Sequence, residues 1–386
     1  MLFNLALILF VAWITDRLFR RVNIPGIVGQ MIIGLILGPS MLGIIRPAEW
    51  ISALAEIGVI ILMFLAGLET NPEQLSRARG PMLLSALGGV FLPLVAGTWL
   101  TLSLGANHYK AIFMGTILTA TSVSVTARTL LDIGQLRSTE GTAILGAAVV
   151  DDVVGIVILT VVLALAAHSG AAGHGLVLTV LWVFLKIAIF FAVAWFGGRA
   201  LVRRLARRTQ PKHQGLLLSL AVCFLMAVGA EAVGVAAITG AYLAGLILRG
   251  ARIRALSEEV ETVASGVFVP VFFFSIGAMV DVTWSWSLVA VSAAFSVVAV
   301  LSKALGSFAG ARVGGLTYIQ SLRVGVGMVA RGEVALITAT IGLNAGLLAR
   351  EDYPMVVAMV LVTTLITPLL LRFLYPDDAR TGFASG

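Results

Sequence analysis

Long runs of apolar residues, separated by short polar or charged segments, fill most of this 386-residue chain. A helix needs about 20 apolar residues to cross the hydrocarbon core of a bilayer, because each residue adds about 1.5 Å of length. Runs bounded by charges or by Gly and Pro predict thirteen transmembrane helices. They span residues 2–14, 24–45, 51–68, 82–104, 111–130, 141–167, 175–200, 215–229, 233–248, 263–280, 284–310, 317–345 and 354–373.

The composition agrees with an all-α polytopic membrane protein. Hydrophobic residues make up 59% and charged residues 12% of the chain, with a mean hydropathy of +1.04, whereas soluble domains carry about 25% charged residues. The net charge of +7 does not indicate a nucleic-acid partner, since basic residues of membrane proteins gather in cytoplasmic loops. The single cysteine, Cys223, cannot form an intrachain disulfide and indicates no metal-binding motif. We expect no cofactor.

The basic residues of the predicted loops sort strongly to one side of the membrane. Nineteen Lys and Arg residues fall on one side, whereas only Arg46, Lys110 and Arg350 fall on the other. The positive-inside bias therefore predicts an N-terminus outside and a C-terminus in the cytoplasm. The first apolar run has its basic residues after it, which is the reverse of a secretory signal peptide, so we expect a retained helix.

Two parts of the chain match each other at a spacing of about 210 residues. Residues 29–37 match residues 240–248, and residues 64–67 match 274–277, each followed by an acid, Glu69 or Asp281. This spacing displaces the second copy by seven helices, and an odd displacement inverts its topology, as in many transporters. We predict one transmembrane domain, 1–386, containing an inverted repeat of six helices. Helices 1–6 fall in residues 1–167, linker helix 7 in 168–213 and helices 8–13 in 214–386.

Helices 5 and 12 each contain a polar interruption at the middle of the membrane. These interruptions are Thr119-Ala-Thr-Ser122 and Val329-Ala-Arg-Gly332, again about 210 residues apart. Unwound backbone at this depth is tolerated only where it is buried in protein or faces water, and two broken, crossing helices often form an ion site. The alternative is two intact helices whose Thr and Ser hydroxyls bond to the preceding turn.

Asp151 and Asp152 lie side by side within the apolar run 142–167. By helical rise they lie roughly 16 Å from Glu140, near the centre of a hydrocarbon core about 30 Å thick. An acid at this depth costs on the order of 3 kcal/mol unless it has a partner, a cavity or a transported ion. Because adjacent helical residues point about 100° apart, we expect the two carboxylates to have different roles.

Lys303 is the cation expected to pair with one of these aspartates. It lies nine residues before Arg312, at a depth similar to that of the aspartates, and a buried lysine is costly unless it is paired. The alternative is a lysine that extends alone to the interface. An ion pair with one aspartate would leave the other facing a water-filled crevice, where a proton and a small cation compete for it. The oxygens of Thr121 and Ser122 suit a hard cation.

Together, the Asp-Asp pair, the Thr119–Ser122 interruption, Lys303 and the stretch Gly327-Met-Val-Ala-Arg-Gly-Glu333 resemble the bacterial sodium/proton antiporters of the cation:proton antiporter superfamily, most closely the NapA type. The resemblance implies thirteen helices, a homodimer formed through a scaffold domain, and an elevator-like core domain in the cell (inner) membrane. It implies that Asp152 is the essential carboxylate that binds sodium, with Thr121 beside the ion and Asp151 paired with Lys303. It also implies electrogenic exchange of sodium or lithium for protons.

Arg331 and Glu333 are two residues apart, so on an intact helix they would not face each other. Either the helix is unwound there or each residue has its own partner. We expect both to support the core rather than to bind the ion.

Other functions with similar sequence features are a potassium/proton antiporter of the same superfamily and a sodium-coupled organic-anion symporter. An intramembrane aspartyl protease needs two aspartates that share a proton across the substrate, and hence aspartates on different helices. Because Asp151 and Asp152 are adjacent on one helix, we expect a transporter of small cations with no catalytic residues rather than an enzyme. Its expected partners are membrane lipid and a second copy of the chain.

Overall fold

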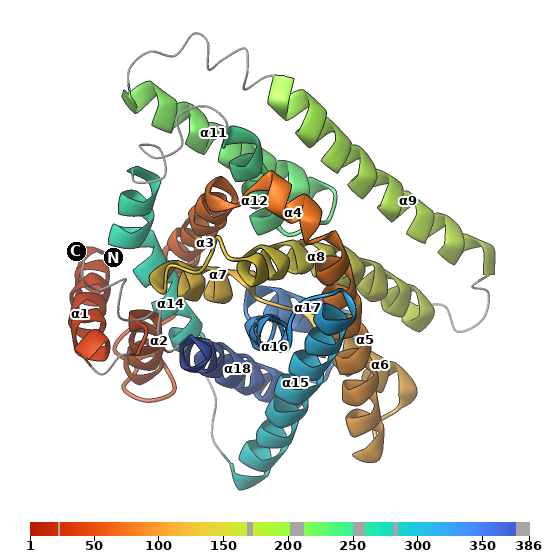
Figure 1. Cartoon of the computed structure of the whole chain (residues 1–386). Helices are drawn as coiled ribbons and strands as arrows, with labels where there is room; N and C mark the ends of the chain where they lie inside the picture. The colour runs from red at the N-terminus through yellow and green to blue at the C-terminus, as the bar shows by residue number, and fades with distance from the viewer. Residues whose placement is uncertain (22–23, 168–172, 201–211, 250–258, 281–284, 376–386) are drawn as a thin grey trace.

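The computed structural model describes residues 1–21, 24–167, 173–200, 212–249, 259–280 and 285–375. All regular secondary structure in these ranges is helical (Figure 1). The elements are α1 (Leu2–Arg21), α2 (Gly26–Leu37), α3 (Glu49–Glu69), α4 (Pro72–Arg77), α5 (Arg79–Ser103), α6 (His108–Thr119), α7 (Val123–Asp132), α8 (Thr139–Ala167), α9 (Gly173–Ala192), η1 (Val193–Gly198), α11 (Lys212–Ala232), α12 (Ala237–Leu248), η2 (Ala264–Phe268), α14 (Val269–Ala278), α15 (Trp286–Val313), α16 (Tyr318–Gly327), α17 (Glu333–Asn344), η3 (Arg350–Asp352) and α18 (Tyr353–Leu374).

Within the described ranges, ten helical segments are long and apolar enough to cross a membrane, and three shorter apolar helices accompany them. Each of the thirteen predicted runs overlaps one of these segments, although the count of thirteen crossings stays a prediction. The bounds differ most in the predicted run 24–45, because α2 ends at Leu37. Pro39 lacks a backbone N–H and disfavours helical geometry at Gly38, which ends the helix there.

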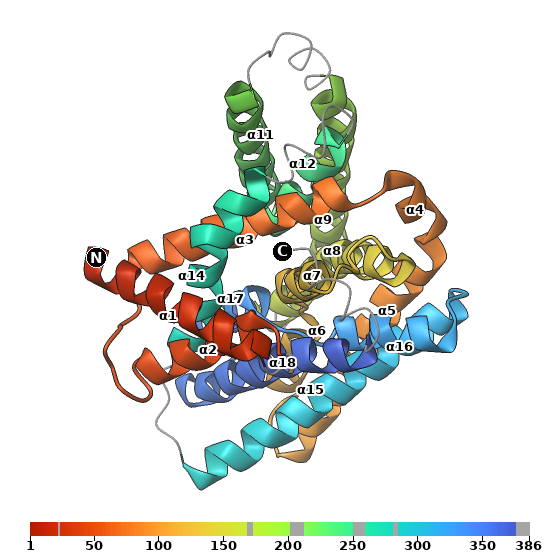
Figure 2. The same ribbon diagram turned by 60° about the vertical axis from the view of Figure 1, so that its left-hand side comes forward.

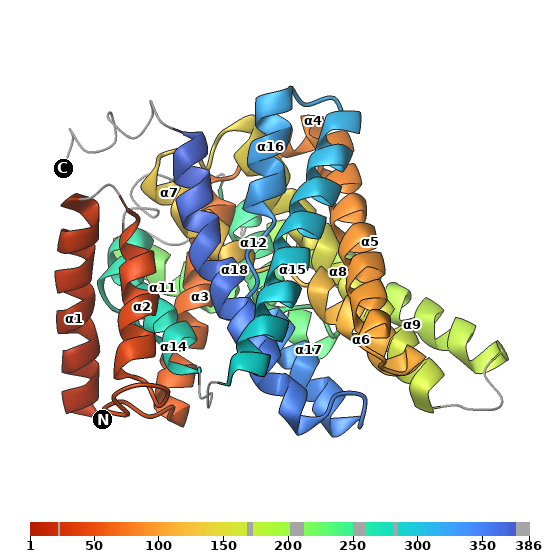
Figure 3. The same ribbon diagram turned by 90° about the horizontal axis from the view of Figure 1, so that it is seen from below.

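The long helices run in roughly one direction when the molecule is seen from below, with the N-terminus at one end and the last turn of α18 at the other (Figure 3). The chain is therefore a multi-pass membrane protein. Which end faces the cytoplasm stays a prediction. Asp281 and the predicted boundaries in 168–172, 201–211 and 376–386 lie outside the described residues.

Most of the helices pack into two groups. We call α1, α2, α3, α11, α12 and α14 the α3 group, and α5, α6, α7, α8, α15, α16, α17 and α18 the α8 group. Helix α9 packs beside α8 and α11, and with α11 it lies on the side of the molecule away from α15 and α18 (Figures 1 and 2). The groups meet where α3 contacts α7 and α2 contacts α18.

Glycines bring the backbones of the α3 group into direct contact. A Cβ on Gly34 of α2 would lie 2.1 Å from Phe274 O of α14, and one on Gly245 of α12 would lie 2.2 Å from Phe64 O of α3. Gly34 and Gly245 occupy equivalent positions in the two copies of the sequence repeat. Each copy thus contributes the same glycine to a contact with the other copy, as a two-fold related repeat requires. The inverted repeat itself stays a prediction.

Helices 5 and 12 of the sequence prediction are both broken. The chain leaves α6 after Thr119 and enters α7 at Val123, and it leaves α16 after Gly327 and enters α17 at Glu333. The two non-helical segments touch, because the Ser122 N–H donates to Ala330 O at 2.7 Å. The alternative of two intact helices is therefore wrong for this structure.

Candidate functional site

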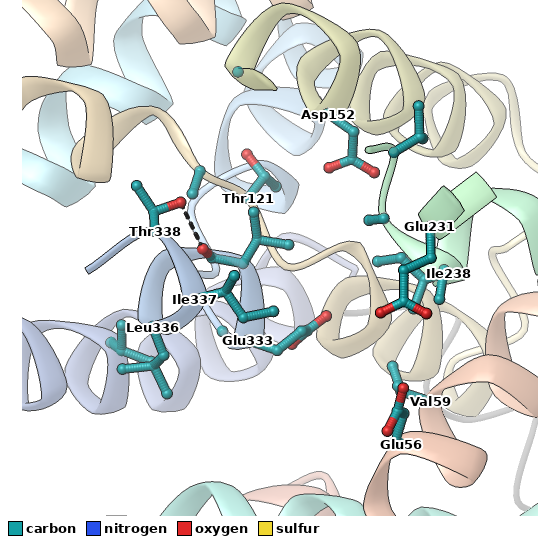
Figure 4. A pocket seen from close by; sticks show the side chains of 18 of the residues that line it. Glu56, Val59, Thr121, Asp152, Glu231, Ile238, Glu333, Leu336, Ile337 and Thr338 are labelled. Carbon is teal, nitrogen blue, oxygen red and sulfur yellow. Dashed lines mark hydrogen bonds between the residues drawn. The ribbon is translucent and has the colours of Figure 1, made fainter. Parts of the chain in front are cut away.

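A cavity of about 570 Å³ lies between the α3 and α8 groups. Its wall includes the first half of α3, the end of α11, the start of α12, the end of α14 and much of α17. Five carboxylates line it, namely Asp151, Asp152, Glu333, Glu56 and Glu231. Figure 4 places Asp152 and Glu333 on one side and Glu56 and Glu231 on the other.

The cavity extends from the aspartates toward one end of the molecule. The ends of α11, α14 and α17 that line it adjoin the loops predicted to lie outside. In the opposite direction the second half of α3, from Leu62 to Leu68, is buried in the main hydrophobic core. The cavity that Asp151 and Asp152 line therefore extends toward one side of the described structure.

Asp151 is held by partners from its own helix group. Lys303 Nζ of α15 lies 3.0 Å from both carboxylate oxygens, and the Thr121 hydroxyl donates to Oδ2 at 2.5 Å. Both charged side chains are almost completely buried. The ion pair expected between Lys303 and one aspartate is thus present, and the alternative of a lysine extended alone to the interface is wrong.

Asp152 has a different environment from its neighbour. It lines the cavity, and the Thr239 hydroxyl of α12 donates to its Oδ2 at 2.5 Å. Sequence reasoning missed Thr239, because one threonine in an apolar helix usually bonds to its own preceding turn. The one available signal was that Thr239 precedes the repeated segment at 240–248, where the first copy has Val28.

Two buried cations contact the carbonyls at the broken ends of the helices. Lys303 Nζ donates to Thr119 O at 2.6 Å, and the Arg331 guanidinium donates to Leu118 O and to Val329 O, the latter at 3.0 Å. The C-terminal end of a helix carries about half a negative charge on its unpaired carbonyls. Lys303 and Arg331 therefore stabilise a helix ending that would otherwise be costly in the membrane.

Glu333 is the first residue of α17, where the helix N-terminus favours negative charge. Its Oε2 accepts a bond from the Ser122 hydroxyl at 3.2 Å, while its buried Oε1 has no partner among the described residues. Ser122 is fully buried and does not line the cavity, unlike Thr121. Arg331, within the non-helical segment, and Glu333, at the start of α17, thus have separate partners. Their functional roles stay predictions.

The formal charges around the cavity favour a bound cation. Three carboxylates, of Asp151, Asp152 and Glu333, lie with two cations, of Lys303 and Arg331, in a region with little solvent exposure. If all five groups are ionised, the cluster carries one uncompensated negative charge. In a medium of low dielectric constant, one proton or one small cation removes that imbalance.

Comparisons with known proteins agree with this chemistry. The family model described as sodium/hydrogen exchanger, transmembrane, matches residues 6–375. The Na(+)/H(+)-K(+) antiporter GerN of Bacillus cereus is 39% identical over 378 residues, which cover 97% of this chain and 96% of GerN. The Na(+)/H(+) antiporter of Enterococcus hirae is 34% identical over 372 residues, which cover 96% of each chain.

A solved structure has a similar fold. The sodium proton antiporter MjNhaP1 from Methanocaldococcus jannaschii at pH 8 superposes with a TM-score of 0.57 at 19% sequence identity. The match covers 99% of this chain and 96% of that chain.

Proposed function

Because the chain is a cation/proton antiporter that belongs to the sodium/hydrogen exchanger family, we propose that it exchanges sodium or lithium for protons at Asp152. The observation that carries this proposal is the difference between the two adjacent aspartates. Both aspartates line the cavity, but Asp151 is neutralised by Lys303, whereas Asp152 accepts a hydrogen bond only from the Thr239 hydroxyl among the described residues. Asp152 is therefore the carboxylate available to an ion that enters the cavity.

Exchange follows from competition for this one carboxylate. A sodium ion bound to Asp152 and a proton bound to Asp152 each remove the same negative charge, so binding of one excludes the other. Thr121 and the backbone carbonyls of the α6–α7 break provide further oxygen ligands for a hard cation.

The two helix groups provide a route to alternating access. All the partners of Asp151 belong to the α8 group, so that group can move past the α3 group without breaking the ion pair. We propose elevator-like movement of the α8 group, and that the described cavity is the outward-facing form. Residues that pack α3 against α7 would separate when the site opens to the cytoplasm.

The proposed exchange is electrogenic. The pair of Asp151 and Lys303 provides a second group that can gain or lose a proton when the ion binds at Asp152. More than one proton would then move for each sodium ion.

We further propose a homodimer in the cell (inner) membrane with the N-terminus outside. The bias of basic residues toward one set of loops supports the orientation. Exposed apolar side chains on α1, such as Phe10 and Trp13, and on α9, such as Leu178 and Trp182, provide surfaces for lipid or a second copy.

Exchange by purified protein in liposomes with a lumenal pH dye tests the proposal. Sodium or lithium should drive proton movement that responds to an imposed membrane potential, and Asp152→Asn should abolish it. Asp352→Asn changes an acid that pairs with Lys110 away from the cavity, so it should retain exchange. Equal activity in Asp152→Asn would contradict the assignment of the site.

Potassium is the second candidate ion, because the name of GerN includes potassium. The same liposomes with potassium in place of sodium separate the two. Proton movement with potassium alone would identify a potassium/proton antiporter. The exchanger family match favours either form of exchange over sodium-coupled organic-anion symport.

A further inference from the structure

Thr239 is the one described residue of the α3 group that donates a hydrogen bond to the two aspartates. Its hydroxyl lies 2.5 Å from Asp152 Oδ2, and both residues are buried. The partners of Asp151, in contrast, are Thr121 and Lys303 of the α8 group. Asp152 is thus the point at which the ion site is bonded across the boundary between the groups.

The fold fixes Thr239 to the α3 group. The chain reverses between α11 and α12 at Gly234, whose φ is +92°, and the Thr239 N–H then donates to Ala236 O in the first turn of α12. Further along, α12 contacts α3 backbone to backbone at Gly245 and Gly67. If the α8 group moves, Thr239 stays with α3 and its bond to Asp152 breaks.

We propose that Thr239 is a positioning residue that stabilises Asp152 while the site is empty and outward-facing, and that sodium or a proton must displace its hydroxyl. This inference rests on the proposed function. A short bond from a hydroxyl to a carboxylate is strong, because the acceptor is charged. If the bond between Thr239 and Asp152 exists only in the empty site, it must break when sodium or a proton binds. The free energy of breaking it then weakens the affinity for either ion.

Other charged groups also affect the binding of sodium or a proton at Asp152. They are Asp151 on α8, Glu333 on α17 and Lys303 on α15, with Glu56 of α3 and Glu231 of α11 on the far wall of the cavity. Replacing Thr239 changes none of these charges. A change in ion affinity on its replacement therefore reports the hydroxyl itself.

Thr239→Val keeps the shape of the side chain and removes the donor. We expect it to tighten sodium binding, so that the KM for sodium at alkaline pH falls about tenfold, the effect of losing one competing bond to a charged group. The pH range of activity should also move upward, because the proton binds Asp152 more tightly as well. Thr239→Ser restores the donor and should restore both wild-type values.

Thr338→Val is the matched control. Thr338 also lines the cavity, but its hydroxyl donates to Val334 O of its own helix at 2.8 Å (Figure 4). We expect this variant to keep the wild-type KM. A Thr239→Val variant that only damaged the site would raise the KM for sodium, which is the opposite sign.

The experiment is sodium-driven proton movement in liposomes for wild type, Thr239→Val, Thr239→Ser and Thr338→Val. If Thr239→Val does not transport, the sodium concentration that half-saturates its thermal stabilisation in detergent replaces the KM. A lower KM or half-saturating sodium concentration in Thr239→Val supports the inference, and an unchanged or higher one overturns it. In the latter case the proposed function still stands if wild type exchanges ions and Asp152→Asn does not. A wild type without exchange would overturn the proposed function and this inference with it.

Discussion

Removal of Lys303 gives a quantitative test of the buried charge balance. Lys303 Nζ donates to both oxygens of Asp151 at 3.0 Å and to Thr119 O at 2.6 Å, without solvent exposure. In Lys303→Met, Asp151 keeps only the hydroxyl of Thr121 as a donor. Breaking a buried ion pair from one side costs about 3–5 kcal/mol, because the other charge is left uncompensated.

A double-mutant cycle separates this penalty from lost packing. Asp151→Asn alone should cost a similar amount, since it leaves the ammonium of Lys303 without its carboxylate. The double variant lacks both charges, so its stability should lie within about 2 kcal/mol of wild type. The coupling free energy between the two positions is then at least about 4 kcal/mol, because the two single losses sum to about 6–10 kcal/mol.

Cys223 provides the assay. It is the single cysteine of the chain and is fully buried, so a thiol-reactive fluorescent dye reports unfolding in detergent. A loss of 1 kcal/mol lowers the melting temperature by about 2 °C in a large domain, which predicts a fall of about 6–10 °C for each single variant. Single variants that melt with wild type, or a double variant that loses the sum of both, would refute the reasoning.

The penalty in Lys303→Met should depend on pH with a definite sign. Without the ammonium, Asp151 is tolerated in the core when it carries a proton, so the folded variant binds more protons than the unfolded chain. Stability is then lost as pH rises. The loss of stability relative to wild type should be larger at about pH 9 than at about pH 6. This pH dependence should vanish in the double variant, which lacks the Asp151 carboxylate.

Three further predictions concern other parts of the molecule. Gly245→Val places a Cβ 2.2 Å from Phe64 O and should cost about 2 kcal/mol or more in the same thiol assay, whereas Gly215→Val meets no atom within 4 Å and should not. Arg331→Met leaves Leu118 O and Val329 O without their donor and should slow exchange about tenfold. Arg331→Lys should recover part of the rate. An unchanged rate in Arg331→Met would contradict a supporting role for Arg331. If one proton competes with one sodium ion for Asp152, the KM for sodium should rise up to about tenfold for each unit by which pH falls, and a KM independent of pH would exclude competition.

The sequence predicts those parts of the site in which a charged or polar group is buried in the membrane and therefore needs a partner. A lysine and two aspartates in apolar helices need partners, so an ion pair between Lys303 and one of the aspartates follows from energetic cost. The choice of Asp151 came from the family resemblance, and Asp151 is the partner in the structure. The breaks in helices 5 and 12 are predictable in the same way, because Thr119–Ser122 and Val329–Gly332 interrupt otherwise apolar runs.

Contacts of side chains that could also be satisfied within their own helix could not be predicted. Thr15, Thr70 and Thr101 bond to their own preceding turns. In the sequence, Thr239 differs from them only by its position directly before the repeated segment 240–248. The early end of α2 at Leu37 was also missed, since the apolar residues up to Ile45 hide the effect of Pro39. Ile45 is fully buried without being helical, so hydrophobicity alone did not mark the end of the helix.

The glycine contacts of the α3 group have a consequence for the order of folding. Gly34 contacts α14 and Gly67 contacts α12. Each glycine therefore packs against a helix that is synthesised more than 170 residues later. Small residues allow helices to associate in a bilayer only when the matching surface has been inserted. The early helices α2 and α3 must therefore reside in the bilayer with these grooves facing lipid until the second half of the chain arrives. A ribosome stalled before α12 should leave the first half inserted but open to protease, and release of the full chain should close it.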